Sequence, residues 1–232
     1  MANVRLVGLS KNYKRGAEVI KALDGVTLDI EKGEFVAVVG RSGSGKTTML
    51  DLLGLLLKPT SGSLFIDDVE TARLNDRERA HMRARRVGFV FQEYNLLSGL
   101  NVLENVMLPL RYVKDGKNGR GRAVELIERV GLSDRVKHRP SELSGGQMQR
   151  VAIARSMVNS PSLILLDEPT GAVDTETAQQ LVDLLKRLND EEQVTIVLVT
   201  HDLDLADQAK RQIRLKDGKV LSDQRVGAGT PA

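Results

Sequence analysis

Hydrophobic residues occur along the chain in two patterns, alternating and continuous, and the order of these patterns predicts the kind of sheet. Residues 4–9 and 26–30 alternate apolar and polar side chains, which is typical of strands buried on one face. Residues 34–39 are instead a continuous apolar run that ends at Gly40, which predicts a central strand buried on both faces. We expect further strands at residues 63–66, 87–92, 163–166 and 194–200, and a hairpin of 213–215 with 219–221 around Asp217-Gly218.

Segments with helical periodicity separate most of these strands. Asn75 with Glu78, and Asn101 with Glu104, have the spacing of capping boxes, which are typical of helix starts. The expected helices are residues 46–57, 75–86, 122–130, 175–189 and 204–210.

Buried strands separated by helices predict an α/β fold with mainly parallel strand pairing. The segment at about 93–159 holds no convincing strand, so we expect a helical subdomain inserted into the sheet. Within it, the polar and glycine-rich residues 111–122 predict a loop. Residues 222–232 have little to bury and predict a disordered tail. The length of 232 residues suits one large domain, 1–232.

Composition excludes several kinds of site. The chain has 34 basic and 31 acidic residues and a formal net charge of +3, so it lacks the strong basic excess of many nucleic-acid-binding proteins. Aromatic residues make up 3% of the sequence, too few to favour a stacking surface for single-stranded nucleic acid. Cysteine is absent, which excludes disulfides and thiolate metal sites.

No segment of the sequence predicts a signal peptide or a membrane span. The N-terminal residues lack a long apolar core. The longest apolar runs, at 52–57 and 163–166, are far shorter than the ~20 residues that span a bilayer. We therefore expect a protein of cytosolic type that would serve a membrane from its surface.

A phosphate-binding motif follows the predicted central strand. It fits the pattern G-x-x-x-x-G-K-[ST] in the strand–turn–helix context that the pattern requires. Glycines let backbone N–H groups close around a phosphate, Lys46 reaches the β- and γ-phosphates, and Thr47 is a ligand for Mg²⁺. The alternative is a turn that precedes a lysine by chance. The motif consists of Gly40, Arg41, Ser42, Gly43, Ser44, Gly45, Lys46 and Thr47.

Two carboxylates follow the apolar run 163–166. Asp167 lies where a buried strand ends, which predicts a Walker B acid beside a metal-bound phosphate. Glu168 is the candidate for polarising an attacking water, or else a solvated loop acid. His201 also follows a predicted strand, 194–200, although a lone histidine is more often structural than catalytic.

The segment Leu143-Ser144-Gly145-Gly146-Gln147 precedes apolar positions with helical periodicity. Ser144 and Gln147 have capping-box spacing, which predicts that a helix begins here. A helix N-terminus with two glycines also exposes N–H groups and a positive dipole end to an anion. Capping alone and capping combined with anion binding are both compatible with this segment.

Taken together, the phosphate-binding motif and the segment 143–147 make the chain resemble the nucleotide-binding subunit of an ATP-binding-cassette (ABC) transporter, over about residues 4–218. The resemblance implies a P-loop NTPase (RecA-like) core with a mainly parallel sheet, an N-terminal antiparallel β part and a helical insertion. It implies ATP and Mg²⁺ as cofactors, with residues 40–47 and Thr48 at the nucleotide. It also implies an ATP-sandwich dimer with a second copy of the chain. In that dimer the γ-phosphate bound by one copy is contacted from the other by Ser144, Gly145, Gly146 and Gln147.

The resemblance assigns roles to further residues. Glu168 matches the catalytic glutamate, and His201 matches the switch histidine that contacts the γ-phosphate. Gln92 matches the Q-loop glutamine at Mg²⁺ or the attacking water, unless it is an ordinary polar strand end. Tyr13 matches the aromatic residue that stacks on adenine, or is a partly buried strand-end tyrosine. Asp174 belongs to the D-loop, or only caps the next helix. The implied metal ligands are Thr47, Gln92 and Asp167.

The stretches 87–92, 95–97, 103–110 and 144–155 are most similar to the subgroup with lipoprotein-release, macrolide-export, antimicrobial-peptide-resistance and cell-division subunits. This similarity implies an ATPase at the cytoplasmic face of the membrane. It would drive a transmembrane permease subunit in the export or extraction of a peptide, lipoprotein or drug-like substrate, with no nucleic-acid partner. The alternative is a regulatory ATPase that signals through a membrane partner without transport.

Two surfaces are candidates for contact with the membrane partner. Residues 93–110 follow Gln92, and we expect them to expose apolar side chains such as Tyr94, Leu96, Leu97 and Leu100. The alternative is a role in the core, which we expect some of these residues to have. A basic cluster predicts a solvated helix face or contact with lipid headgroups. It consists of Arg73, Arg77, Arg79, Arg83, Arg85 and Arg86.

Overall fold

The apolar run after Glu34 forms β3 (Phe35–Val39), an interior strand of a six-stranded sheet. All five residues of β3 are buried, and alternate side chains of a strand point to opposite faces. Phe35 and Val39 belong to the hydrophobic core on one face of the sheet, whereas Val36 and Val38 belong to the core on the other face. The sheet is therefore covered on both sides, as the unbroken apolar run predicts.

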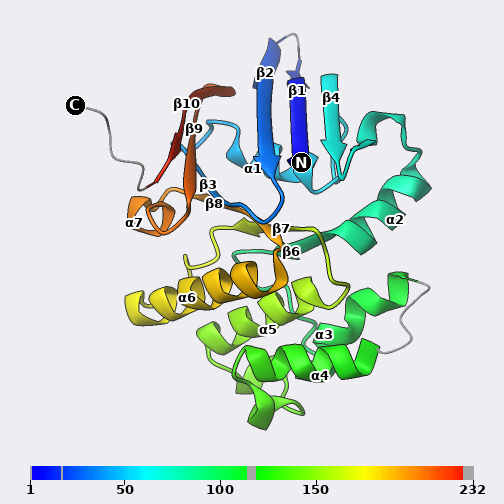
Figure 1. Cartoon of the computed structure of the whole chain (residues 1–232), viewed down its shortest axis with the longest axis vertical. Coiled ribbons are helices and arrows are strands. Elements are labelled where there is room, and N and C mark those ends of the chain that lie inside the picture. The colour runs from blue at the N-terminus through cyan, green and yellow to red at the C-terminus, as the bar shows by residue number, and fades with distance from the viewer. Residues whose placement is uncertain (1, 17, 114–118, 227–232) are drawn as a thin grey trace.

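The computed structural model describes residues 2–16, 18–113 and 119–226 (Figure 1). The six-stranded sheet has the order β10-β9-β3-β8-β7-β6 and is parallel except for the β9–β10 pair. A four-stranded antiparallel sheet has the order β2-β1-β4-β5. The other strands are β1 (Ala2–Arg15), β2 (Glu18–Glu31), β4 (Ser61–Ile66), β5 (Val69–Glu70), β6 (Val87–Val90), β7 (Leu163–Asp167), β8 (Thr195–Thr200), β9 (Arg211–Lys216) and β10 (Lys219–Arg225).

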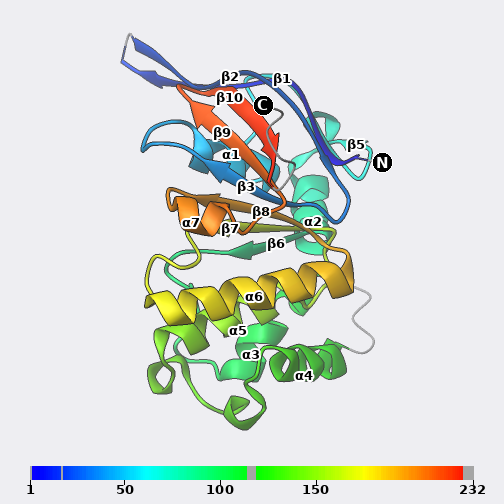
Figure 2. The ribbon, with the colours of Figure 1, turned by 60° about the vertical axis from the view of Figure 1, so that its left-hand side comes forward.

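Helices lie on both faces of the six-stranded sheet (Figure 2). Met49 and Leu53 of α1 share a core with Leu28 of the antiparallel sheet and Val36 of β3. The opposite face is covered by α5 and α6, with α3 and α4 beyond them. The helices are α1 (Lys46–Leu53), α2 (Asp76–Arg86), α3 (Val102–Met107), α4 (Gly119–Arg129), α5 (Gly145–Met157), α6 (Thr175–Glu192) and α7 (Leu203–Ala206), with 3-10 turns η1 (Thr71–Arg73), η2 (Leu108–Tyr112), η3 (Ser133–Arg135) and η4 (Pro140–Glu142).

Helices and turns make up the described part of the segment between β6 and β7. Asn101 caps α3 by accepting a hydrogen bond from the Glu104 amide, and the Glu104 carboxylate accepts one from the Asn101 amide. Asn75 and Glu78 start α2 in the same way. Both capping boxes expected from the sequence are therefore present, and the described residues of 93–159 contain no strand.

The antiparallel strands are longer than their apolar patterns predict. β1 and β2 pair from Ala2–Glu31 to Arg15–Glu18, well beyond the expected ranges, because backbone pairing also includes polar residues at the end of the ribbon. The prediction of a disordered tail from residue 222 is likewise wrong for residues up to Arg225. This residue ends β10 and pairs with Arg211 of β9. Residues 227–232 of that tail lie outside the described residues.

Several helical boundaries also differ from expectation, and α7 ends at Ala206 rather than at residue 210. α1 ends at Leu53, earlier than expected, because Gly54 is its C-cap and Leu55 adopts the left-handed conformation with φ of 58°. The loop expected at 111–122 is wrong in its last part, since α4 begins at Gly119. Its residues 114–118 lie outside the described residues.

The expected solvated arginine face is wrong for Arg79, which is buried. Its guanidinium donates to the Leu55 carbonyl oxygen at 2.9 Å, and the Arg83 guanidinium donates to the same oxygen at 3.1 Å. Leu55 follows Gly54, the C-cap of α1, and these two bonds satisfy its carbonyl oxygen. Arg79 and Arg83 therefore fasten α2 to the end of α1.

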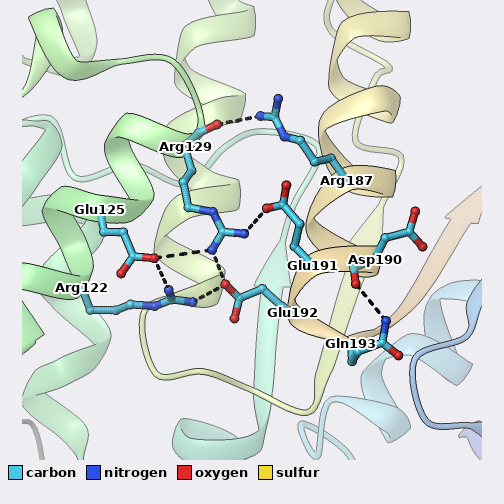
Figure 3. Close-up of polar contacts among 8 residues, drawn as sticks. All are labelled: Arg122, Glu125, Arg129, Arg187, Asp190, Glu191, Glu192 and Gln193. Carbon is cyan, nitrogen blue, oxygen red and sulfur yellow. Dashed lines mark hydrogen bonds and ion pairs between the residues drawn. The ribbon is translucent and has the colours of Figure 1, made fainter.

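Charged side chains join α4 of the helical segment to α6 (Figure 3). Arg129 forms ion pairs with Glu191 and Glu192 in the last turn of α6. Arg122 also pairs with Glu192, at 2.9 Å. In the opposite direction, Arg187 of α6 donates to the Arg129 carbonyl oxygen at 2.8 Å. Arg122 and Arg129 are partly buried, so water and salt screen these pairs less than pairs on an open surface.

We expect Arg129→Met to lower the free energy of unfolding by about 1–2 kcal/mol, because it removes several charge-assisted hydrogen bonds while keeping much of the side-chain bulk. Urea unfolding at low and high NaCl measures this loss, which should shrink as salt screens the charges. Lys21→Met removes an exposed pair with Asp24 and is the control, with an expected loss below about 0.5 kcal/mol. Equal losses in the two variants would contradict a special contribution of the network.

Candidate functional site

The loops that follow β3, β7 and β8 meet at one edge of the six-stranded sheet. Val39 lies opposite Thr200, and Asp167 lies opposite Val199. Because these strands are parallel, their carboxyl ends reach the same edge. The phosphate-binding motif, the two carboxylates and His201, which are far apart in the sequence, are therefore brought together.

The phosphate-binding loop adopts a shape that requires glycine. Gly43 and Gly45 have φ angles of 77° and 103°, in the region that favours glycine. A Cβ atom on Gly40 would lie 2.5 Å from the Leu215 carbonyl oxygen. A Cβ atom on Gly45 would lie 2.3 Å from the Ala22 carbonyl oxygen. Backbone conformation and lack of space therefore both exclude larger residues here.

The same loop presents donors suited to an anion. The Lys46 ammonium donates to the carbonyl oxygens of Gly40 and Arg41, at 2.7 and 3.2 Å. The Ser44 hydroxyl oxygen is buried and has no hydrogen-bond partner among the described residues. Gly45, the N-cap of α1, offers no side-chain acceptor to the first amides of the helix. Phosphate oxygens match this set of donors, so the residues present fit a nucleotide.

A cavity of about 670 Å³ opens beside the loop. It is lined by the loop with Thr47 and Thr48, by the two carboxylates, by His201 and by residues 20–22 of β2. A second cavity of about 700 Å³ shares Ser42 with the first and extends to the β9–β10 hairpin. Sequence reasoning missed the β2 wall and the hairpin wall, because no local motif marks them, although Lys21, Arg214 and Lys216 are among their lining residues.

Asp167 ends β7 in a setting that suits a cation. Burial raises the pKa of its carboxyl group above the ordinary value, the charges of Glu168 and Asp51 raise it further, and Lys46 opposes them. A divalent cation beside Asp167 would favour the ionised form. Mg²⁺ is commonly bound by one or two carboxylates together with phosphate oxygens. Thr47 and Asp167 fit this arrangement, and no group of three or more acidic or histidine side chains in the described residues could hold a metal.

Glu168 is held in place by several polar contacts. Its carboxylate accepts hydrogen bonds from the Thr200 hydroxyl and the His201 amide, each at 3.0 Å. The backbone of Glu168 has a φ of 45°, which is strained for a residue other than glycine, and its amide donates to the Val199 carbonyl oxygen. The carboxylate is therefore fixed beside the phosphate-binding loop.

His201 is joined to Glu168 through its side chain as well. Its Nδ1 atom lies 2.7 Å from Glu168 Oε1, although the imidazole ring itself is largely exposed. This hydrogen bond and the negative charge of Glu168 raise the pKa of His201 above its ordinary value. The structure thus brings together two side chains that the sequence predicts separately.

Gln92 follows β6 and is exposed. A Cβ atom added to Gly171 would lie 3.1 Å from the side-chain nitrogen of Gln92, so the two residues are close neighbours. The next loop holds Tyr94 and Asn95, both in the left-handed conformation. Arg155 of α5 donates to the carbonyl oxygens of Asn95 and Tyr94, at 2.5 and 2.8 Å. Sequence reasoning missed Arg155, because nothing in the local pattern indicates which carbonyl groups it binds.

Ser144 caps α5 as its spacing predicts, in a reciprocal capping box with Gln147. The two glycines that follow are close-packed. A Cβ atom on Gly145 would lie 2.8 Å from the Tyr94 hydroxyl, and one on Gly146 would lie 2.4 Å from a Thr177 methyl carbon. Among the described residues that line the two cavities beside the phosphate-binding loop, none belongs to 144–147.

The structure also places Tyr13 and Asp174, two further residues that the sequence predicts for the site. Tyr13 is exposed on β1 opposite Ile20, which lines the 670 Å³ cavity. The Lys11 ammonium lies 5.5 Å from the centre of the Tyr13 ring. Asp174 is the N-cap of α6, since its carboxylate accepts the Thr177 amide at 2.9 Å. Adenine stacking by Tyr13 and a D-loop role for Asp174 stay predictions.

Comparisons with known proteins agree with this site. The family model described as ABC transporter matches residues 23–171. An uncharacterized ABC transporter ATP-binding protein of Methanocaldococcus jannaschii, MJ0796, is 47% identical over 228 residues, covering 96% of this chain and 97% of that one. The macrolide export ATP-binding/permease protein MacB of Rhodopirellula baltica is 46% identical over 98% of this chain, which spans 34% of that longer protein.

Solved structures give the same result. MJ0796 in a dimeric post-hydrolysis state bound to ADP and Pi has a TM-score of 0.87 at 45% identity, with 97% of this chain and 100% of that chain covered. The structure of cbiO1 from Clostridium perfringens also has a TM-score of 0.87, at 28% identity, over 97% of this chain and 88% of that one. The predicted fold class is therefore confirmed. The chain belongs to the ABC transporter family as an ATP-binding subunit, an ATPase that uses ATP together with Mg²⁺.

Proposed function

We propose that two copies of the chain close around ATP at the cytoplasmic face of a membrane and drive a permease that exports or extracts a peptide, lipoprotein or drug-like substrate. The observation that carries this proposal is the convergence of the phosphate-binding loop, Asp167, Glu168 and His201 at one sheet edge. The 46% identity to a protein named for macrolide export and permease activity supports the transport role. None of the helices in the described residues has the length and apolar character needed to span a bilayer.

The nucleotide would be bound by the glycine loop, with Lys46 at the β- and γ-phosphates and Tyr13 at the base. Thr47, Asp167 and Gln92 would hold Mg²⁺, which supplies positive charge against the phosphates when bound. Ser44 has a buried hydroxyl that a phosphate oxygen would satisfy. Lys46, Thr47 and Asp167 line the cavity and Ser44 lacks a partner among the described residues, whereas Tyr13 and Gln92 are assigned from the resemblance to the family.

Glu168 would orient the water that attacks the γ-phosphate. The hydrogen bonds from Thr200 and the His201 amide hold the carboxylate, so its direction does not depend on the flexible side chain alone. His201 would contact the γ-phosphate with the face of its ring that is exposed. Because its contact with Glu168 favours the protonated ring, His201 would bring positive charge to the developing anion.

A second copy would complete each site. The start of α5 offers a helix N-terminus at Ser144, Gly145 and Gly146, yet these residues do not line the cavities beside the chain's own phosphate-binding loop. An anion at this N-terminus would therefore come from a partner molecule. The dimeric state named for the MJ0796 structure supports this arrangement.

The permease would dock beside the loop that follows Gln92. A groove of about 590 Å³ lies there, lined by Leu56, Phe91, Tyr112 and Arg155 among others. Leu56 and Tyr112 are exposed apolar residues. Such a groove with an exposed apolar rim is typical of a surface for a partner protein.

The apolar residues of the loop divide between the surface and the core, as expected. Leu97 is 48% exposed, whereas Leu96 packs against the core, and Tyr94 and Leu100 are partly buried. Asn105, which is fully buried, accepts the Leu97 amide and donates to the Leu97 and Leu100 carbonyl oxygens. The loop is thus fastened to α3 with Leu97 left pointing to solvent, which makes Leu97 the better docking candidate.

The hydrolytic role is tested by Glu168→Gln. We expect this variant to bind MgATP, to lose ~10²–10⁴ in turnover, and to become a stable dimer with MgATP while staying monomeric without it. Phosphate release and light scattering measure these outcomes. Lys46→Ala is the matched comparison, which should weaken nucleotide binding itself. Near-normal turnover by Glu168→Gln would contradict the catalytic assignment. A molar mass by light scattering that is the same with and without MgATP would contradict the sandwich dimer.

The contact of His201 with Glu168 is tested by NMR titration without nucleotide. The pKa of His201 should lie above the ordinary value of 6.5 in the wild type and fall toward it in Glu168→Gln. Because the pKa of His201 is raised in the folded protein, its contact with Glu168 adds to the free energy of unfolding. This contribution is fully present below pH 6.5 and is lost as pH rises through the raised pKa. An unchanged His201 pKa in the variant would show that the pair does not form in solution.

Docking is tested by Leu97→Gln in the complex with the chain's own permease. We expect lower permease-stimulated ATPase activity and unchanged basal activity, because Leu97 lies outside the nucleotide site. Val7→Gln is the control, since Val7 is 46% exposed on β1 of the antiparallel sheet and changes equally in polarity. Loss of basal activity together with unfolding would mean that Leu97 serves the core, and equal effects in the two variants would also argue against docking here.

A further inference from the structure

The turn of the β9–β10 hairpin touches the phosphate-binding loop through backbone atoms. Lys216 pairs with Lys219, and the two residues between them, Asp217 and Gly218, have φ angles of 49° and 76°. Positive φ at both positions is the mark of a tight two-residue hairpin turn. The turn therefore has a fixed shape and presents its peptide groups in fixed directions.

One residue of this turn joins two walls of the nucleotide cavity. The Gly218 amide donates to the Ser44 carbonyl oxygen at 3.1 Å. The Gly218 carbonyl oxygen accepts the Asp24 amide of β2 at 2.9 Å. Residues 20–22, which precede Asp24, line the cavity. The hairpin turn thus links the phosphate-binding loop on one side to the β2 wall on the other (Figure 2).

The three backbones meet without space for a side chain. A Cβ atom on Gly218 would lie 2.9 Å from the Ala22 carbonyl oxygen and 3.1 Å from the Leu23 Cα atom. The same Ala22 oxygen would lie 2.3 Å from a Cβ atom on Gly45. Because the obstructing atoms are backbone, they cannot move aside as a flexible side chain would.

This contact meets a requirement of any loop that binds phosphate with its amides. When such a loop turns N–H groups inward, its carbonyl groups point outward and need donors of their own if they are buried. Ser44 is 5% exposed, and the Gly218 amide donates to its carbonyl oxygen. We propose that Gly218 is a positioning residue for nucleotide binding, which holds the phosphate-binding loop and the β2 wall in the shape that accepts the phosphates. Gly218 lies outside residues 23–171, the part matched by the family model.

The test is Gly218→Ala, with MgADP affinity measured by calorimetry so that neither hydrolysis nor dimerisation contributes. We expect MgADP binding about five- to tenfold weaker, since displacing the turn strains or breaks a neutral hydrogen bond that orders the loop. Gly131→Ala is the matched control. Gly131 has the same φ of 76°, but its Cβ atom would meet only the Arg150 guanidinium, at 3.7 Å. The two glycines therefore match in φ, whereas the steric contact with backbone at the nucleotide site occurs only at Gly218.

The readouts separate positioning from simple support of the fold. Thermal unfolding without nucleotide should show losses of stability in both variants, while MgADP affinity should fall in Gly218→Ala and stay within about twofold of wild type in Gly131→Ala. Wild-type MgADP affinity in a destabilised Gly218→Ala protein would overturn the proposal. Because it rests on binding, this test is independent of whether Glu168 is the catalytic residue.

The wild-type protein gives a second test that does not require any variant to fold. If the turn holds the loop in its binding shape, bound MgADP must in return stabilise the turn. Amide exchange followed by NMR should therefore slow at residues 217–219 on addition of MgADP, and change little at 223–225, the open end of the hairpin. Equal exchange at 217–219 with and without MgADP would overturn the proposal.

Discussion

The parallel register of β3, β7 and β8 is the constraint on which the site depends. These strands are buried on both faces, so their interiors hold apolar residues and polar chemistry is confined to the loops at their ends. Asp167 opposite Val199 places Glu168 beside the Thr200 hydroxyl and the His201 amide. A slip of one residue would turn every side chain of a strand to the other face and remove these contacts. The register that aligns the ends of these strands therefore also fixes the position of the carboxylate.

The sequence was sufficient for features that one segment determines alone. The phosphate-binding loop, the strand before Asp167 and the capping box at Ser144 each follow from local spacing, and the structure contains all three. Features that depend on distant backbone were not predictable. The carbonyl oxygen of Ala22 explains why Gly45 has no side chain, and the amide of Gly218 satisfies Ser44, yet neither contact involves a side chain that a pattern could reveal.

The helix α5 connects its own exposed N-terminus, at Ser144, with the loop that follows Gln92. At its start, Gly145 lies so close to the Tyr94 hydroxyl that a Cβ atom would be 2.8 Å away. Further along the helix, Arg155 donates to the Tyr94 and Asn95 carbonyl oxygens. One rigid helix therefore holds the loop after Gln92 at two separate points. A displacement of α5 would carry that loop with it. The lack of a side chain at Gly145 both allows the close approach of Tyr94 and leaves the N-terminus of the helix open.

The way the helical segment is packed limits how it could move. Leu126 of α4, Val151 of α5 and Leu185 of α6 belong to one hydrophobic core with Phe35 of the sheet, so the segment does not form an independent domain. Opening a wide gap would expose this shared core to water, at a cost that grows with the apolar area exposed. Small sliding of packed helices exposes far less. The ion pairs between Arg129 and the end of α6 lie at the border of the core, where long side chains can follow such sliding without breaking. Sliding of these packed helices would therefore cost less than opening a gap, and the loop held by α5 would follow such sliding.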